Sequence, residues 1–210
     1  MNDMTEEQQA ERLREWWREN GRAVLTGLAL GVTLIVGWQG WDGYRQQRTE
    51  AGSDAFAQFR QASTDTETAA EPLITQGETL IREFDDTPYA ALAALELAKR
   101  HVQTNNLDRA EARLRWVMDH ADQPGLPELA RLRLARVLIA ADQADQALAE
   151  LGAAPKGMAA LYDETRGDAL KAKGDLAGAA AAYDQALERL PEATQERIFL
   201  QMKRDNLGIG

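Results

Sequence analysis

The sequence contains no cysteine and only two histidines among its 210 residues. Without cysteine the chain can form no disulfide, offers no thiol nucleophile and cannot be processed as a lipoprotein. Neither histidine belongs to a spacing typical of a metal site, and no glycine-rich loop precedes Lys-Ser or Lys-Thr. His101 falls on a packing position and His120 at a helix end, where a cation suits the dipole. These absences predict a protein that is not an enzyme and holds no cofactor or metal ion.

Basic residues are also in the minority, with 24 Lys and Arg against 34 Asp and Glu, a formal net charge of −10. Nucleic-acid binding requires a basic face, so the acidic excess argues against a nucleic-acid partner. It also argues against a domain that lies flat on anionic lipid. Runs of β-branched residues are scarce, whereas Ala, Leu, Glu, Gln and Arg are common, which predicts an all-α protein.

Residues 23–41 form the longest stretch without an ionisable side chain. As a helix this stretch is roughly 28 Å long, close to the hydrocarbon thickness of a bilayer. Aromatic residues suited to the headgroup layer flank it on both sides, namely Trp16, Trp17, Trp38, Trp41 and Tyr44. A cleaved signal peptide and a buried helix are the alternatives. The acidic residues before the stretch and the bulky tryptophans after it argue against cleavage, so we expect a single transmembrane helix.

Arginines near this stretch indicate its orientation. Four precede it and three follow it, a weak excess that favours a cytoplasmic N-terminus: Arg12, Arg14, Arg18 and Arg22 against Arg45, Arg48 and Arg60. We therefore expect a cytoplasmic tail (1–22), the transmembrane helix (23–41), a stalk with a degenerate first hairpin (42–88) and a periplasmic repeat domain with a capping helix (89–210). The reverse orientation, with the repeats in a cytoplasmic signalling adaptor, stays open.

Gly27 and Gly31 form a small-xxx-small pair within the expected membrane helix. Such a pair lets a second membrane helix approach closely. Glycine is also simply common in membrane helices, so the pair has two interpretations. We predict that another helix packs here, with the general abundance of glycine in membrane helices as the open alternative.

Small and large residues alternate with a fixed spacing within residues 167–191, GDALKAKGDLAGAAAAYDQALERLP. The small ones are Gly167, Ala179 and Ala186, the large ones Leu170 and Tyr183, with a turn at Gly174 between them. This spacing is typical of a tetratricopeptide repeat, in which two antiparallel helices approach closely where one lacks bulk.

Two weaker copies of the pattern precede this repeat. Ala110 and Ala147 take the place of Ala179, and Asn105–Asn106 and Asp142 take the place of the turn glycine. Three copies in register predict a tetratricopeptide-like α-solenoid of helical hairpins. A helix over residues 192–206, with Ile198, Phe199 and Met202, should cap its open end.

Helical repeats present a concave surface made by the first helix of each hairpin, and such a groove suits a peptide. The repeat pattern predicts twelve inward positions: Leu92, Leu95, Lys99, Val102, Leu129, Leu132, Arg136, Ile139, Leu161, Glu164, Asp168 and Lys171. The alternative is that several of these leucines pack beneath the stalk helix and are never exposed. Both interpretations stay open at this point.

Five segments, in order along the whole chain, resemble the YfgM family. They are REWWRENGRAVLTGLALGVTLIVGW (14–38), YAALAALELAKRHV (89–102), LRLARVLIAADQADQAL (132–148), RGDALKAKGD (166–175) and LQMKRDNL (200–207). The resemblance implies an inner-membrane protein with one span, a periplasmic repeat domain and a role as an ancillary subunit of the SecYEG translocon. It also implies association with the periplasmic chaperone PpiD and with emerging secretory polypeptides. The family has no catalytic motif, so no catalytic, cofactor-binding or metal-binding residue follows from it.

A second function fits the same architecture. A membrane-anchored repeat protein could be a scaffold for envelope or cell-wall assembly with no translocon role, because such repeats bind many kinds of partner and fold does not fix function. The two functions differ in what co-purifies with the protein, translocon components or envelope synthases.

Overall fold

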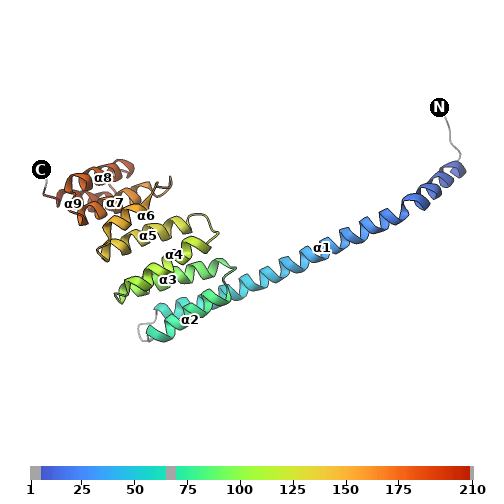
Figure 1. The fold of residues 1–210 in the computed structure, drawn as a ribbon, viewed down its shortest axis with the longest axis horizontal. Helices are drawn as coiled ribbons and strands as arrows, with labels where there is room; N and C mark the ends of the chain where they lie inside the picture. Colours follow the sequence, from blue (N-terminus) through green and yellow to red (C-terminus); the bar gives the residue numbers. More distant parts are fainter. Residues whose placement is uncertain (1–5, 65–69, 209–210) are drawn as a thin grey trace, which may run out of the picture. The chain divides into compact units, whose positions relative to one another are not determined.

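A computed structural model describes residues 6–64 and 70–208 of the chain (Figure 1). Within these ranges the chain forms nine α-helices and no strand, and the predicted all-α class is confirmed. Two units can be distinguished, one ending at Glu50 and one beginning at Ala51. The helices are α1 (Glu6–Thr64), α2 (Ala70–Glu83), α3 (Pro88–Gln103), α4 (Leu107–His120), α5 (Leu126–Ala140), α6 (Ala144–Leu151), α7 (Ala159–Ala172), α8 (Leu176–Arg189) and α9 (Gln195–Asp205).

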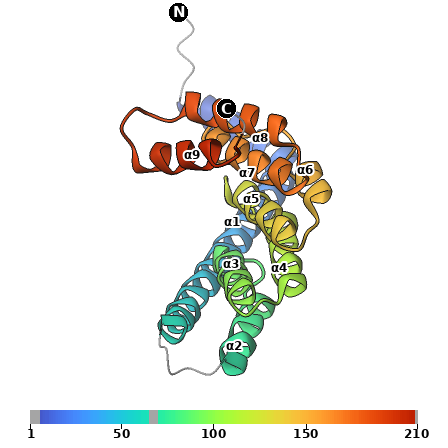
Figure 2. The ribbon, with the colours of Figure 1, turned by 90° about the vertical axis from the view of Figure 1, so that its left-hand side faces the viewer.

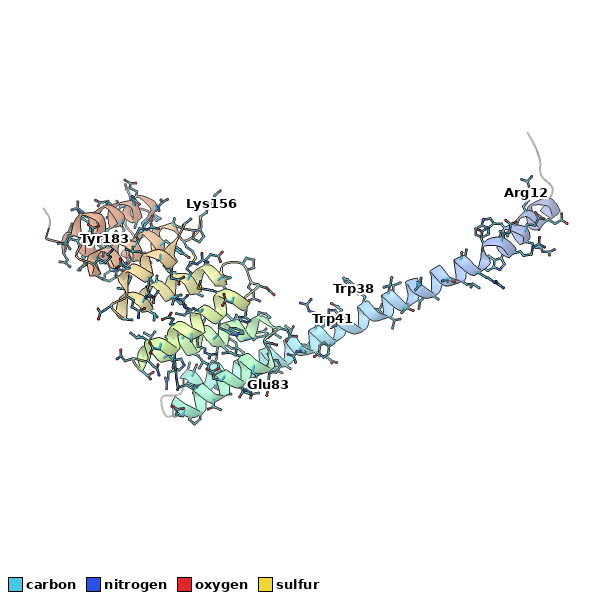
Figure 3. All side chains as sticks on the ribbon, viewed as in Figure 1. Arg12, Trp38, Trp41, Glu83, Lys156 and Tyr183 are labelled. Carbon is cyan, nitrogen blue, oxygen red and sulfur yellow. The ribbon has the colours of Figure 1, made fainter. Side chains whose placement is uncertain are left out.

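The first unit is the α1 segment that ends at Glu50. Its apolar side chains point outward all round, with Leu34 74% and Trp38 76% exposed. Figure 3 shows Trp38 and Trp41 directed away from the helix. Among the described residues, α1 is the one helix long and apolar enough to cross a membrane. A helix that is apolar on every side needs an apolar surrounding such as lipid.

The second unit begins with the last turns of α1, which pack against α2 and the start of α3. Phe59 is fully buried, and the rings of Phe56 and Tyr89 lie 5.9 Å apart. A Cβ atom at Gly52 would lie 3.1 Å from Oγ1 of Thr87, so the absence of a side chain allows this close approach. These contacts join the end of α1 to the helical stack.

The turns within the three predicted hairpins share one backbone conformation. Asn105, Asp142 and Gly174 have φ angles of 56°, 59° and 82°, all in the left-handed region. Asparagine, aspartate and glycine tolerate this region better than other residues, so the predicted turn positions are confirmed. The alanines Ala110, Ala147 and Ala179, predicted to sit where helices approach, are all completely buried.

Helices α3, α5 and α7 form the inner row of the stack. Each hairpin packs on the next in chain order, and in addition α3 contacts α5 and α5 contacts α7 (Figures 1 and 2). The Tyr162 hydroxyl on α7 donates a hydrogen bond of 2.8 Å to the carbonyl of Glu128 on α5. The first helices of successive hairpins therefore share one face, as a solenoid requires.

The C-terminal helix α9 packs against α8. Leu200 and Leu207 are buried with Ala179, Tyr183 and Ala186. Ile198, Phe199 and Met202 are each more than half exposed. Thr194 caps the helix by accepting a hydrogen bond from the Arg197 N–H. The helix thus runs over fewer residues than the expected 192–206, and it turns the face bearing Leu200 toward α8 and the face bearing Ile198, Phe199 and Met202 away from it.

Candidate partner-binding groove

The inner row contains a cavity of about 360 Å³ between α3 and α5, here called the α3/α5 cavity. Its floor is apolar and buried and consists of Ala98, Leu114 and Val137. Its walls are Val102, Gln103 and Ala140, and its basic rim is Lys99, Arg133 and Arg136. The volume lies at the small end of the roughly 300–1,000 Å³ typical of ligand sites. An apolar recess under basic side chains can therefore receive one or two apolar groups.

The basic rim is only partly neutralised by the chain itself. Lys99 Nζ lies 3.2 Å from a carboxylate oxygen of Glu96, one turn away on the exposed face of α3. Arg136 Nε donates a hydrogen bond of 3.3 Å to the Thr165 hydroxyl on α7. Within residues 6–64 and 70–208, no carboxylate pairs with Arg133 or Arg136. The rim thus carries uncompensated positive charge on a protein of net charge −10.

Three of the twelve predicted groove positions line this cavity, namely Lys99, Val102 and Arg136. Two others lie in the core instead: Leu95 is 6% and Leu132 1% exposed. Their placement on the groove surface is therefore corrected. On α3 the predicted Lys99 and Val102 both line the cavity, whereas on α5 three lining residues lie one residue beyond predicted positions, namely Arg133, Val137 and Ala140. Leu95 and Leu132 are left to the core.

The remaining predicted positions divide between partial burial and exposure. Leu92, Leu129 and Ile139 are partly buried, and the last two pack against the core. Leu161 and Lys171 on α7 are exposed. The structure therefore does not bring the twelve positions together into one continuous groove.

Glu164 and Asp168 on α7 are occupied by the chain's own C-terminal helix. The Lys203 ammonium on α9 donates hydrogen bonds of 2.7 Å to Glu164 and 2.8 Å to Asp168, and the Tyr183 hydroxyl donates to Asp168 at 2.8 Å. Burial lowers the pKa of Lys203, but the bonds to Asp168 and Glu164 outweigh it and leave that pKa raised. Burial, followed by the bond to Asp168, also raises the pKa of Tyr183. The third repeat thus offers no free groove at these two carboxylates.

A larger cavity of about 650 Å³ lies between the end of α1 and α2. Its lining is mainly apolar, with Leu80 and Phe84, and includes polar residues such as Glu71, Thr75 and Thr79. It lies outside the inner row formed by α3, α5 and α7. This cavity therefore lies at the N-terminal end of the helical stack and is not part of the predicted groove.

The two histidines lie apart from any group of candidate metal ligands. No group of three or more His, Asp or Glu side chains able to hold a metal ion occurs among the described residues. His101 is 2% exposed, as its packing position predicted, and burial together with the nearby Arg109 lowers its pKa. The His120 ring stacks on Trp116 at 4.5 Å.

The predicted packing site in the membrane helix stays a prediction. Apart from the neighbouring backbone of α1 itself, no described atom lies within 4 Å of a Cβ built at Gly27 or Gly31. This open space could accept another helix, and nothing in the single chain fills it.

Sequence reasoning missed most of the cavity. Arg133 and Ala140 were not among the predicted positions, although both lie on one helical stripe with Arg136, at spacings of three and four residues. Two arginines and a small residue on one face of an otherwise leucine-rich helix are the signal that could have identified it.

Comparisons with known proteins cover nearly the whole chain. Residues 14–209 match the protein family described as "Tetratricopeptide repeat-like domain". A protein of Escherichia coli (strain K12) named "Ancillary SecYEG translocon subunit" is 34% identical over 206 residues, which are 97% of each chain. Proteins of the same name from Haemophilus influenzae and Neisseria gonorrhoeae are each 28% identical, over 96% and 97% of this chain and 97% and 98% of their own. No solved structure matches the chain significantly.

Proposed function

This chain belongs to the YfgM family of tetratricopeptide repeat-like proteins, and on that premise we propose that it is an ancillary subunit of the Sec translocon. Its first unit anchors it in the inner membrane with the N-terminus in the cytoplasm. Its repeat domain stands in the periplasm and binds a PpiD-like chaperone or emerging secretory chains. The α3/α5 cavity is the contact surface for these partners.

The observation that carries this proposal is the near-complete overlap with a relative named as a translocon subunit, 34% identical over 97% of both chains. The overlap includes the apolar part of α1 and the helical stack together, so the whole architecture is shared. An apolar recess on the inner row of a solenoid is the place where such folds bind peptides. The absence of cysteine from the sequence makes the proposal easy to test.

The orientation can be tested with single cysteines. Lys156 is exposed in the loop between α6 and α7, where it points away from the helices (Figure 3), and Arg12 is exposed near the start of α1. Lys156→Cys should react with a membrane-impermeant maleimide in cells with a permeabilised outer membrane, because the proposed topology places it in the periplasm. Arg12→Cys should react only after the inner membrane is opened. The cysteine-free parent gives the blank, and the opposite labelling pattern would reverse the topology.

The partners can be tested by photo-crosslinking in living cells. A probe at Val102, 43% exposed in the wall of the α3/α5 cavity, should form adducts with secretory chains or a periplasmic chaperone. A probe at Gly31 should form adducts with translocon subunits. Gln146, exposed on α6, is the matched control and should stay unreactive toward the same partners.

Each outcome distinguishes the candidate functions. Adducts with envelope synthases at Val102, without any translocon adduct at Gly31, would replace the translocon role with the scaffold role. Adducts only with cytoplasmic proteins would indicate the signalling adaptor. Equal adducts at Gln146 and Val102 would contradict partner binding at the α3/α5 cavity. The association with the translocon would then be tested by the Gly31 probe alone.

A further inference from the structure

The α3/α5 cavity combines two features that restrict its ligand. Its floor of Ala98, Leu114 and Val137 is closed and apolar, so it excludes a charged group and favours an aliphatic or aromatic side chain. Its basic rim stands at the mouth, where a ligand's neighbouring groups must lie. A ligand that fits both features has an apolar group flanked by negative charge.

The rim is built from both walls of the cavity. Lys99 comes from α3, whereas Arg133 and Arg136 lie three residues apart on one face of α5. The bond to Thr165 holds the Arg136 guanidinium from α7. A peptide that crosses the cavity from α3 to α5 therefore meets a cation on each side of the recess.

Charge complementarity selects a peptide over a membrane. Arg133 and Arg136 at the rim can pair with the carboxylates of one short segment, and Lys99, which also lies beside Glu96, adds positive charge on the opposite wall. The chain as a whole has a net charge of −10, which repels an anionic lipid surface that is much wider than the recess. The ligand class is thus a protein segment of local negative charge.

We propose that the α3/α5 cavity binds an acidic peptide segment, with one apolar side chain on the cavity floor and flanking carboxylates paired with the basic rim. This deepens the proposed function by naming the partner's chemistry, and its use in the cell rests on that function. Asp and Glu residues beside a Leu, Ile or Phe are the features that the partner segment must carry.

The binding test uses the full chain in a mild non-ionic detergent and three fluorescent peptides, read by anisotropy. The first has one leucine flanked by glutamates, the second replaces the glutamates with lysines, and the third replaces the leucine with serine. The first should bind, and the other two should each bind at least about tenfold more weakly, because each lacks one of the two complementary features. Higher salt should weaken the binding of the first peptide, since its charges pair at a solvent-accessible rim.

Variants then locate the binding to the cavity. Arg133→Glu and Arg136→Glu should each weaken the acidic peptide by about tenfold, because attraction becomes repulsion. Lys156→Glu changes the net charge equally on an exposed loop and should have no effect. Ala140→Trp should fill the recess from its exposed wall and weaken binding similarly, whereas Ala181→Trp on the exposed face of α8 should not. Circular dichroism checks that all variants keep their helix content.

Several results would overturn the inference. These are equal binding of the lysine or serine peptide, equal effects of the Lys156 and Arg133 substitutions, or displacement of the acidic peptide by phosphatidylglycerol vesicles. If binding fails while the Gly31 probe still reaches the translocon and the labelling shows a periplasmic domain, this inference falls and the proposed function stands. If the Gly31 and labelling tests fail while the acidic peptide binds, the proposed function falls and the inference about the cavity's ligand stands.

Discussion

Replacing Gly167 with valine is expected to destabilise the last hairpin of the stack by about 3 kcal/mol or more. A side chain at this position would overlap the Tyr183 ring, whose Cζ lies 3.1 Å from the Cβ position. The ring cannot withdraw, because it is fully buried and its hydroxyl is bonded to Asp168. The helix-propensity gain on replacing glycine, at most about 1 kcal/mol, does not offset this overlap.

Thermal unfolding of the full chain in detergent, followed by circular dichroism, should show Tm lowered by roughly 6 to 12 °C. Gly157→Ala is the control, because a Cβ at Gly157 meets no atom within 4 Å. Adding Tyr183→Leu to Gly167→Val should restore part of the loss, since the smaller side chain makes room. A Gly167→Val variant that unfolds at the parental temperature would show that α7 and α8 do not depend on this close approach.

Replacing Asp163 with alanine is expected to lower the free energy of unfolding by about 2–3 kcal/mol. The Asp163 carboxylate is buried and accepts hydrogen bonds of 2.7 Å from Arg166 Nη1 and 2.7 Å from Arg189 Nε. It thereby ties α7 to the end of α8, and Arg166 in turn donates to the Gly152 carbonyl. Without the carboxylate, two guanidinium groups face each other. Both are partly exposed, so water compensates some of the loss and the effect stays below that of a fully buried pair.

Urea unfolding measures this effect, with Asp184→Ala as the matched control. Asp184 also pairs with an arginine, Arg204 at 3.2 Å, but its side chain is 50% exposed, so its loss should cost less than about 1 kcal/mol. Asp163→Asn should fall between the two, because it keeps the packing and loses the charge. Equal midpoints for Asp163→Ala and Asp184→Ala would contradict a stabilising role for the buried carboxylate.

The sequence pattern indicated the role of Gly167 but not that of Asp163. Gly167 stood out because a small residue at a fixed repeat position implies a close helix approach. Asp163 is one of three carboxylates on α7 and stands in the polar run DETR, which ordinarily indicates a solvated face. Its second partner, Arg189, lies 26 residues away, beyond any helical periodicity.

The sequence by itself determined the class of the fold, the apolar helix and the positions of the repeat turns. These depend on local properties: the length of the uncharged stretch, helix propensity, and the tolerance of Asn105, Asp142 and Gly174 for a left-handed backbone. Complete burial of Ala110, Ala147 and Ala179 also followed from spacing alone.

Only the tertiary structure decided which face of each inner helix is open to a partner. Periodicity shows that Leu132, Arg136 and Ile139 share one side of α5, but the rotation of that helix against its neighbours is set by packing against α3, α4, α6 and α7. Burial of the large apolar side chains turned Leu95 and Leu132 into the core and exposed Arg133 beside Arg136. In the same way, the contact of Lys203 with Glu164 and Asp168 depends on how α9 packs against the last hairpin. Contacts between distant segments depend on the whole fold, and local patterns do not contain them.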